Sequence, residues 1–188
     1  MNDNRSIIAS FESEFAQVRA GAEKAIAQLD AEQIRATLDA ESNSVAVNMK
    51  HLAGNFRSRF TNFLTEDGEK PWRARDQEFI DDFPAGVVGR AAVVSVWNEG
   101  WQVVLTALGF LNDSDLARTV HIRGEALSVS RALARALSHA AYHQGQIVFI
   151  ARRLVGPHQW KTISIARGAS DSFNRSLGYH TQPAPRPA

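Results

Sequence analysis

Two histidines four residues apart are the pair in this chain whose spacing most directly suggests chemistry. His139 and His143 occur in the segment HAAYH, and residues i and i+4 of an α-helix lie above one another on the same face. Two imidazoles in this arrangement can bind one metal ion. Alternatively, they are core histidines that only form hydrogen bonds, or a pair that arises by chance. Both rings are expected to face the core because they continue an apolar stripe at steps of three and four: Ala136, His139, His143, Ile147, Ile150 and Leu154.

This segment differs from the helix of the HExxH metalloproteases. That motif needs a glutamate directly after its first histidine, because the carboxylate acts as the general base. Here the corresponding residue is Ala140. We therefore do not expect a protease of that kind, and a third metal ligand must come from another segment.

His51 is the best candidate for the third ligand. It lies in another segment with helical periodicity, beside a polar stripe at spacings of three and four. Three neutral imidazoles from two packed helices would form a catalytic type of site, with positions left open for water or substrate. The alternative is a solvated helix flank. The predicted metal ligands are His51, His139 and His143, and the candidate substrate-binding residues of the stripe are Asn48, Asn55 and Arg59.

The residue types leave the identity of the metal open. Three imidazoles suit Zn, Ni, Fe or Cu; we expect a divalent ion, Zn or Ni first, with Fe or Cu as alternatives. Glu78, Asp81 and Asp82 could bring a carboxylate to the ion from a long loop, but their spacing selects none of them as a ligand. Trp97 and Trp101 could line a pocket, although their spacing fits a core seam better.

Four segments have the periodicity of amphipathic helices. Gly156 and Pro157 end the last of them, and its Gly145 suggests a close approach of another helix. With no strong strand pattern, these segments favour an all-α protein built as a four-helix bundle, in which the second and fourth helices are adjacent because both must reach one ion. The expected helices span about 4–29, 44–64, 90–111 and 128–155.

The connections between these helices differ in character. The charged stretch 65–86, with glycines and two prolines, predicts a long crossover that carries Trp72 and Phe79 onto the helices. The alternation in RTVHIRG predicts a short strand or extended arm. Segment 158–174 contains four large apolar residues and is expected to pack back on the helices. We expect one domain over 1–178 and a disordered Pro-rich tail over 179–188.

Composition narrows the function further. The 188 residues carry 21 basic and 20 acidic side chains, for a formal net charge of +1, with the signs interspersed. This balance argues against a nucleic-acid surface or an anionic-membrane binder. The chain has no cysteine, so any thiol chemistry must use a thiol from outside. Because we find neither a signal-peptide pattern nor a membrane span, we expect a cytoplasmic location.

Three longer segments resemble a known family. They are NMKHLAGNFRSRFTNFLTEDGEKPWRARDQEF, IRGEALSVSRALARALSHAAYHQGQIVFIARRL and QWKTISIARGAS. Together they look like the DUF1572 branch of the DinB/YfiT-like superfamily. The resemblance implies a four-helix bundle, frequent assembly as a homodimer, and a metal triad formed by His51, His139 and His143.

The resemblance also implies a reaction class. The superfamily contains thiol-dependent S-transferases and a thiol-dependent isomerase that use low-molecular-weight thiols. A metal-activated thiol or water acting on a small molecule is therefore the expected chemistry, in a metal-dependent thiol S-transferase or a hydrolase. Two alternatives stay open: a non-catalytic, stress-related metal-binding protein, and a dimeric interaction module. Apolar residues in segment 158–174 add support for a homodimer.

Overall fold

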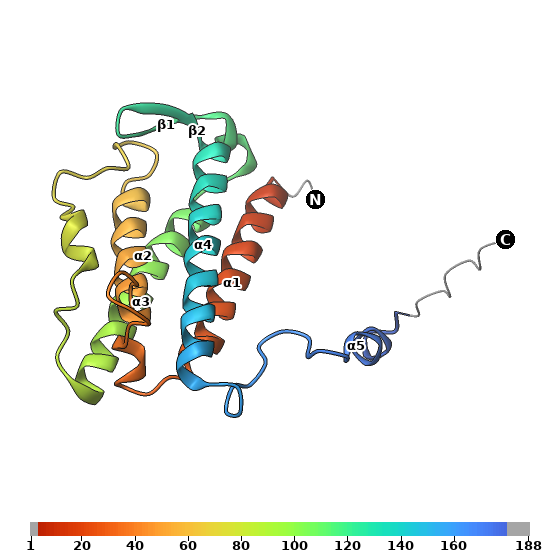
Figure 1. Cartoon of the computed structure of the whole chain (residues 1–188). Helices are drawn as coiled ribbons and strands as arrows, with labels where there is room; N and C mark the ends of the chain where they lie inside the picture. The colour runs from red at the N-terminus through yellow and green to blue at the C-terminus, as the bar shows by residue number, and fades with distance from the viewer. Residues whose placement is uncertain (1–3, 180–188) are drawn as a thin grey trace.

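The computed structural model describes residues 4–179, and this part of the chain is mostly helical. Helical residues make up 61% of it, in five α-helices and short 3-10 turns, with one small two-stranded sheet. Four long helices lie side by side (Figure 1). They are α1 (Ser6–Ile26), α2 (Val45–Phe60), α3 (Gly86–Gly109) and α4 (Val129–Val155). The prediction of a mostly helical protein is confirmed, and the sheet is an addition to the expected all-α class.

Local sequence signals set the ends of the two helices that carry the histidines. The Ser44 hydroxyl accepts a hydrogen bond from the Val47 amide, and the Ser128 hydroxyl accepts one from the Arg131 amide. Each serine is therefore the N-cap of its helix, α2 or α4. Gly156 ends α4 with a φ of 80°, a conformation that glycine adopts without steric cost. Helices α2 and α4 contact one another, as the expected site requires.

Aromatic side chains fill the core between the helices. Trp97 and Trp101 of α3 are buried, so the prediction that they form a core seam is confirmed. Phe56 of α2 packs against Trp101 with ring centroids 4.8 Å apart, and Phe15 of α1 packs against the same indole at 6.3 Å. One large aromatic cluster thereby joins three of the long helices.

The crossover between α2 and α3 runs along the outer side of these helices (Figure 1). It contains a short 3-10 helix, η2 (Arg75–Phe79), which periodicity did not reveal. Phe79 contacts the ring of His51, with centroids 4.6 Å apart, as the predicted packing requires. Trp72 stays more than half exposed and lies over the guanidinium of Arg57.

The expected extended arm is one strand of a β-hairpin. Strand β1 (Thr119–Ile122) pairs antiparallel with β2 (Glu125–Ser128). The turn residues Arg123 and Gly124 both have positive φ, 56° and 76°. The Asp67 carboxylate accepts hydrogen bonds from both of their amides, at 2.8 and 2.7 Å. These bonds attach the hairpin to the beginning of the crossover.

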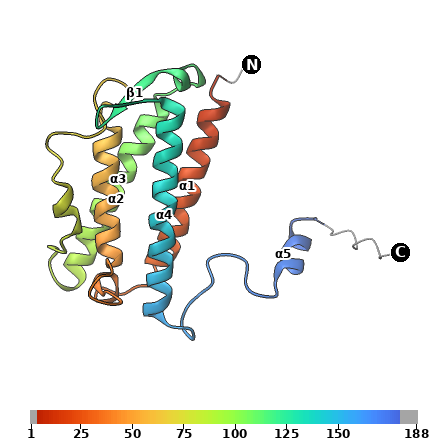
Figure 2. The ribbon, with the colours of Figure 1, turned by 45° about the horizontal axis from the view of Figure 1, so that its top comes forward.

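The segment after α4 packs back only in part. Trp160 and Ile163 pack against the core, whereas Ile165 and Phe173 are exposed. Helix α5 (Ser170–Ser176) lies away from the long helices in both views (Figures 1 and 2). The prediction that segment 158–174 packs on the helices is therefore wrong beyond Ile163, because the chain turns away from the long helices there and the apolar side chains that follow stay exposed. The predicted disordered Pro-rich tail, 179–188, lies outside the described residues except for Tyr179.

Within residues 4–179, no helix combines the length and the apolar character needed to cross a membrane.

Two glycines allow a test of helix packing. A Cβ added to Gly100 of α3 would overlap Ala53 of α2, whereas one added to Gly145 of α4 would meet no atom within 4 Å. The expected close approach at Gly145 is therefore wrong, since that residue faces open space, and the close approach occurs at Gly100.

We predict that Gly100→Ala lowers the free energy of unfolding by about 1–3 kcal/mol through overpacking. The matched control Gly145→Ala should raise it by about 0.5–1 kcal/mol. Urea denaturation measures both, and equal stability of the two variants would contradict this packing.

Candidate metal centre

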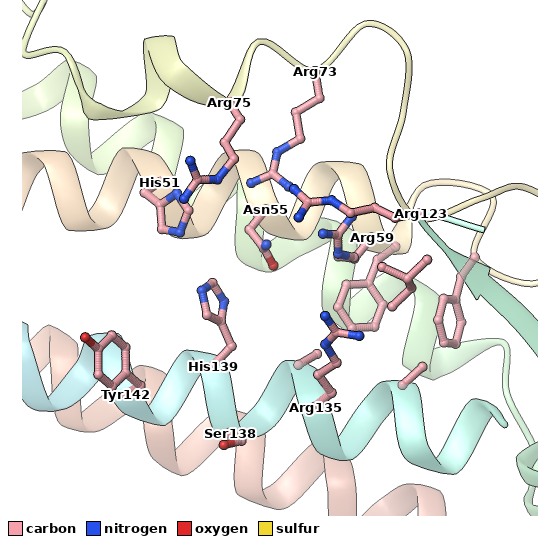
Figure 3. Close-up of a pocket in the computed structure, with 15 residues that line it drawn as sticks. His51, Asn55, Arg59, Arg73, Arg75, Arg123, Arg135, Ser138, His139 and Tyr142 are labelled. Atoms are coloured by element: carbon pink, nitrogen blue, oxygen red, sulfur yellow. The ribbon is translucent and has the colours of Figure 1, made fainter. Parts of the chain in front are cut away.

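Three histidines from two helices come together inside the protein. His51 of α2 and the pair His139 and His143 of α4 each offer one ring nitrogen, and these atoms lie within 4.8 Å of one another. His51 and His143 are buried, and His139 is half-buried. Figure 3 shows His51 and His139 facing one another from opposite sides of a pocket. This cluster could hold a metal ion, and it unites all three of the predicted ligands.

Asn48 fixes the orientation of His143. The side-chain amide of Asn48 donates a hydrogen bond to the Ser44 carbonyl at 2.9 Å, so its Oδ1 faces the other way. That oxygen lies 2.8 Å from Nδ1 of His143 and must accept a hydrogen bond from it. The proton is therefore on Nδ1, and Nε2 of His143 keeps its lone pair. Asn48 is almost fully buried and does not line the pocket.

Glu78 fixes the orientation of His51 in the same way. Its Oε2 accepts a hydrogen bond from Nδ1 of His51 at 2.9 Å, which leaves Nε2 free to bind a metal. Arg73 holds the same carboxylate with two hydrogen bonds, from Nε at 2.8 Å and from Nη2 at 2.9 Å. A carboxylate behind a ligating histidine orients the ring and increases its basicity. Sequence spacing selected no acidic residue as a ligand, and the structure assigns Glu78 to this outer position.

Gly54 makes room for that carboxylate. It lies one helical turn after His51, and a Cβ at this position would overlap the carboxyl group of Glu78. Glycine within a helix costs about 1 kcal/mol relative to alanine, so its presence here has a steric reason. Gly54, one turn from the candidate ligand His51, is a sequence signal that a side chain from another segment approaches α2 closely. It does not identify that side chain as Glu78.

His139 has the least complete set of partners. Its Nε2 lies 3.2 Å from Nε2 of His143, while its Nδ1 is buried and has no hydrogen-bond partner among residues 4–179. Two lone pairs facing one another at this distance would repel. Because Nε2 of His143 carries a lone pair, a proton or a cation must lie between it and Nε2 of His139. A divalent cation beside them would satisfy both lone pairs at once.

The electrostatic environment keeps these rings neutral. Burial lowers the pKa of His139 to about 4, and the positive charges of Arg73 and Arg59 act in the same direction. Burial lowers the pKa of His143 to about 3. Neutral imidazole is the form that binds metal, so both rings are ready to bind at neutral pH. Burial alone would raise the pKa of Glu78, but hydrogen bonds from His51 and Arg73 outweigh it and lower that pKa.

A pocket of about 470 Å³ opens beside the histidines. His51 and His139 form part of its wall, together with Asn55 and Arg59, two of the three predicted substrate-binding residues. Tyr142 of α4 lines it as well. Four further arginines of the wall were not predicted, since they come from the crossover, the hairpin and α4: Arg73, Arg75, Arg123 and Arg135.

The structure thus defines a mostly helical protein with a buried three-histidine cluster beside an arginine-lined pocket. Its sequence matches the family described as "Protein of unknown function (DUF1572)" over residues 2–169, and the chain belongs to this family. No curated protein and no solved structure gives a match. The DUF1572 part of the resemblance is therefore confirmed.

The hydrogen bonds behind His51 lead to a prediction on metal affinity. We predict that Glu78→Gln weakens Zn²⁺ binding about 10- to 100-fold, because the outer carboxylate loses its charge. Gly54→Ala should act in the same direction, because the added methyl group displaces Glu78 from His51. Gly145→Ala, in the open part of α4, is the matched control and should keep the wild-type affinity. Competition with a chromophoric chelator at pH 7 measures the three constants, and unchanged affinity in both site variants would contradict the role of Glu78.

Proposed function

We propose that the protein binds a divalent metal ion through the Nε2 atoms of His51, His139 and His143. The observation that carries this proposal is the pair of outer hydrogen bonds, from His51 to Glu78 and from His143 to Asn48. Both use Nδ1 and leave Nε2 free within one cluster. Zn²⁺ or Ni²⁺ is the expected ion, with Fe or Cu as alternatives, because imidazole suits all four.

We further propose that the chain is a DinB/YfiT-like four-helix bundle. Support comes from the four long helices that lie side by side (Figure 2) and from the origin of the triad, with one histidine on α2 and two on α4. The sequence resemblance to that superfamily included the same three residues. This placement makes a small-molecule reaction with an external thiol the expected activity.

The proposed activity is that of a metal-dependent thiol S-transferase or a hydrolase. A bound divalent cation lowers the pKa of a coordinated thiol or water and so supplies a nucleophile near neutral pH. Three protein ligands leave coordination positions open, and the pocket beside His51 and His139 gives access to them. Glu78 is engaged by His51 and Arg73, so it is not free to act as a general base. The thiol must come from outside, since the chain has no cysteine.

Metal content in histidine variants tests the ligand assignment. We predict that alanine at position 51, 139 or 143 removes most of the bound metal and lowers the thermal midpoint to that of the metal-free wild type. His121→Ala and His158→Ala are the controls and should keep the metal, as should His180→Ala, which alters a residue outside the described range. Full metal retention in His51→Ala, or equal loss in His121→Ala, would show that the site is assigned wrongly.

Turnover tests the enzymatic part separately. We predict that the metal-loaded protein consumes a low-molecular-weight thiol in the presence of an electrophilic acceptor, or hydrolyses an activated ester, and that chelation abolishes the reaction. Ellman titration of the remaining thiol and release of the ester's chromophore measure the two reactions. A protein that binds one metal per chain but turns over no substrate in either screen would instead support the non-catalytic alternative.

We also propose that the protein forms a homodimer. Support comes from α5 and the residues after it, where Phe173, Leu177 and Tyr179 are exposed although they are large and apolar. A second copy of the chain could cover them. Sedimentation velocity at micromolar concentration should show a dimer that Phe173→Asp together with Leu177→Asp dissociates. A wild-type chain that sediments only as a monomer would contradict this proposal.

A further inference from the structure

The pocket beside the three histidines has a strongly positive wall. Five arginines line it, and no acidic side chain among residues 4–179 is part of the lining. Figure 3 shows that they approach from both sides of the pocket: Arg73 and Arg75 from the crossover, and Arg135 from α4. The formal net charge of the whole chain is only +1, so this positive charge is a local property of the pocket and favours an anionic ligand there.

Two of these arginines are held in place by structural contacts. Arg73 is almost fully buried and donates to both carboxylate oxygens of Glu78. Arg59 is mostly buried and donates to the Gly68 carbonyl and, at 2.8 Å, to Glu69. Neither side chain can turn to a ligand without breaking these bonds.

The other three arginines have donors to spare. Arg75, Arg123 and Arg135 are each about half exposed, at 50%, 56% and 54%. The carboxylate paired with Arg75 is that of Asp76, at 3.7 Å, and it is itself almost fully exposed. Arg135 makes one hydrogen bond, to Glu125 at 3.1 Å. Since a guanidinium has five N–H donors, most of the donors on these side chains remain free for a ligand.

The carboxylate that pairs with the Arg123 guanidinium is shared with two other arginines. Oε2 of Glu69 accepts from Arg59 at 2.8 Å, from Arg123 at 3.1 Å and from Arg73 at 3.3 Å. Because Arg73 is also paired with Glu78, the three guanidinium ions share two carboxylates, and an anionic ligand in the pocket would offset the remaining positive charge.

The backbone at Arg123 gives an independent indication. Its φ of 56° lies in the left-handed region, where Asn or Gly is favoured in a two-residue hairpin turn and other side chains are strained. Strained residues that persist often have a functional reason. An arginine at this position places a guanidinium in the wall of the pocket, which Asn or Gly could not do.

We propose that Arg75, Arg123 and Arg135, the arginine cluster, bind an oxyanion group of the substrate, a carboxylate or a phosphate. A pocket of about 470 Å³ accommodates a small organic molecule. Such a molecule would place its oxyanion at the arginine cluster and its reacting atom near His51 and His139. This inference rests on the proposed function and adds the substrate class to it: small organic anions.

Isosteric probes test the charge requirement. We predict that succinate binds the metal-loaded protein at least about 10-fold more tightly than its neutral analogue succinamide, and that added salt weakens succinate binding. Inorganic phosphate is the second arm: tighter binding of phosphate than of succinate would assign a phosphate group, and the reverse a carboxylate. Isothermal titration calorimetry measures the constants. Equal affinity for succinate and succinamide would overturn the inference.

Arginine variants locate the binding site. Arg135→Gln and Arg123→Asn should each weaken succinate binding about 5-fold or more, the loss expected for one charge-assisted hydrogen bond. Arg131→Gln is the matched control, because Arg131 also lies on α4 and contacts the same Glu125, at 3.7 Å, but does not line the pocket. Unchanged affinity in both pocket variants would overturn the inference.

Two further readouts separate this inference from its alternatives. Arg123→Asn should keep or raise the thermal midpoint while it weakens succinate binding, because asparagine suits the turn. A lower midpoint with unchanged succinate affinity would give Arg123 a purely structural role and contradict the inference. The titrations are repeated on metal-free protein, where the same dependence on Arg123 and Arg135 is expected at weaker affinity. Metal content is measured separately. If the protein binds no metal but still binds succinate through Arg123 and Arg135, the proposed function is contradicted and this inference is not.

Discussion

The carboxylate of Glu78 connects the parts of the protein on which the site depends. It accepts a hydrogen bond from His51 on α2 and is held by Arg73 from the crossover. Buried imidazoles lose their contacts with water, and in His51 and His143 a protein partner on Nδ1 takes their place, which leaves Nε2 free. Gly54 leaves the space in which this carboxylate lies. Without this chain of contacts, His51 would have neither a fixed tautomer nor a fixed orientation.

The fold supplies these contacts from segments far apart in the sequence. Helices α2 and α4 bring His51 to His139 and His143, while the crossover supplies both the outer carboxylate and part of the positive wall. The β-hairpin closes another side of the pocket with Arg123, and Asp67 ties its turn to the crossover. The irregular segments thus determine the electrostatics of the site, and the regular helices determine its geometry.

Local patterns in the sequence were sufficient for the parts of the site that lie on helices. The i, i+4 spacing and the apolar stripe placed His139 and His143 together on the core side of one helix, and His51 followed from helical periodicity together with the family resemblance. The role of Glu78 could not be predicted, because it depends on a contact between residues 27 positions apart through a crossover without periodicity. The pocket arginines come from several separate elements, so no spacing rule links them. The exposed position of α5 was missed because the apolar residues of a segment do not show whether they pack on their own chain or stay exposed.

The most direct test of the three-histidine site is X-ray absorption spectroscopy of the zinc-loaded protein. We predict a first shell with three imidazole nitrogens at about 2.0–2.1 Å and at least one exchangeable oxygen ligand from water. Addition of a low-molecular-weight thiol should replace that oxygen with a sulfur at about 2.3 Å. A first shell with fewer than three imidazoles, or with no exchangeable oxygen ligand, would contradict a catalytic three-histidine centre.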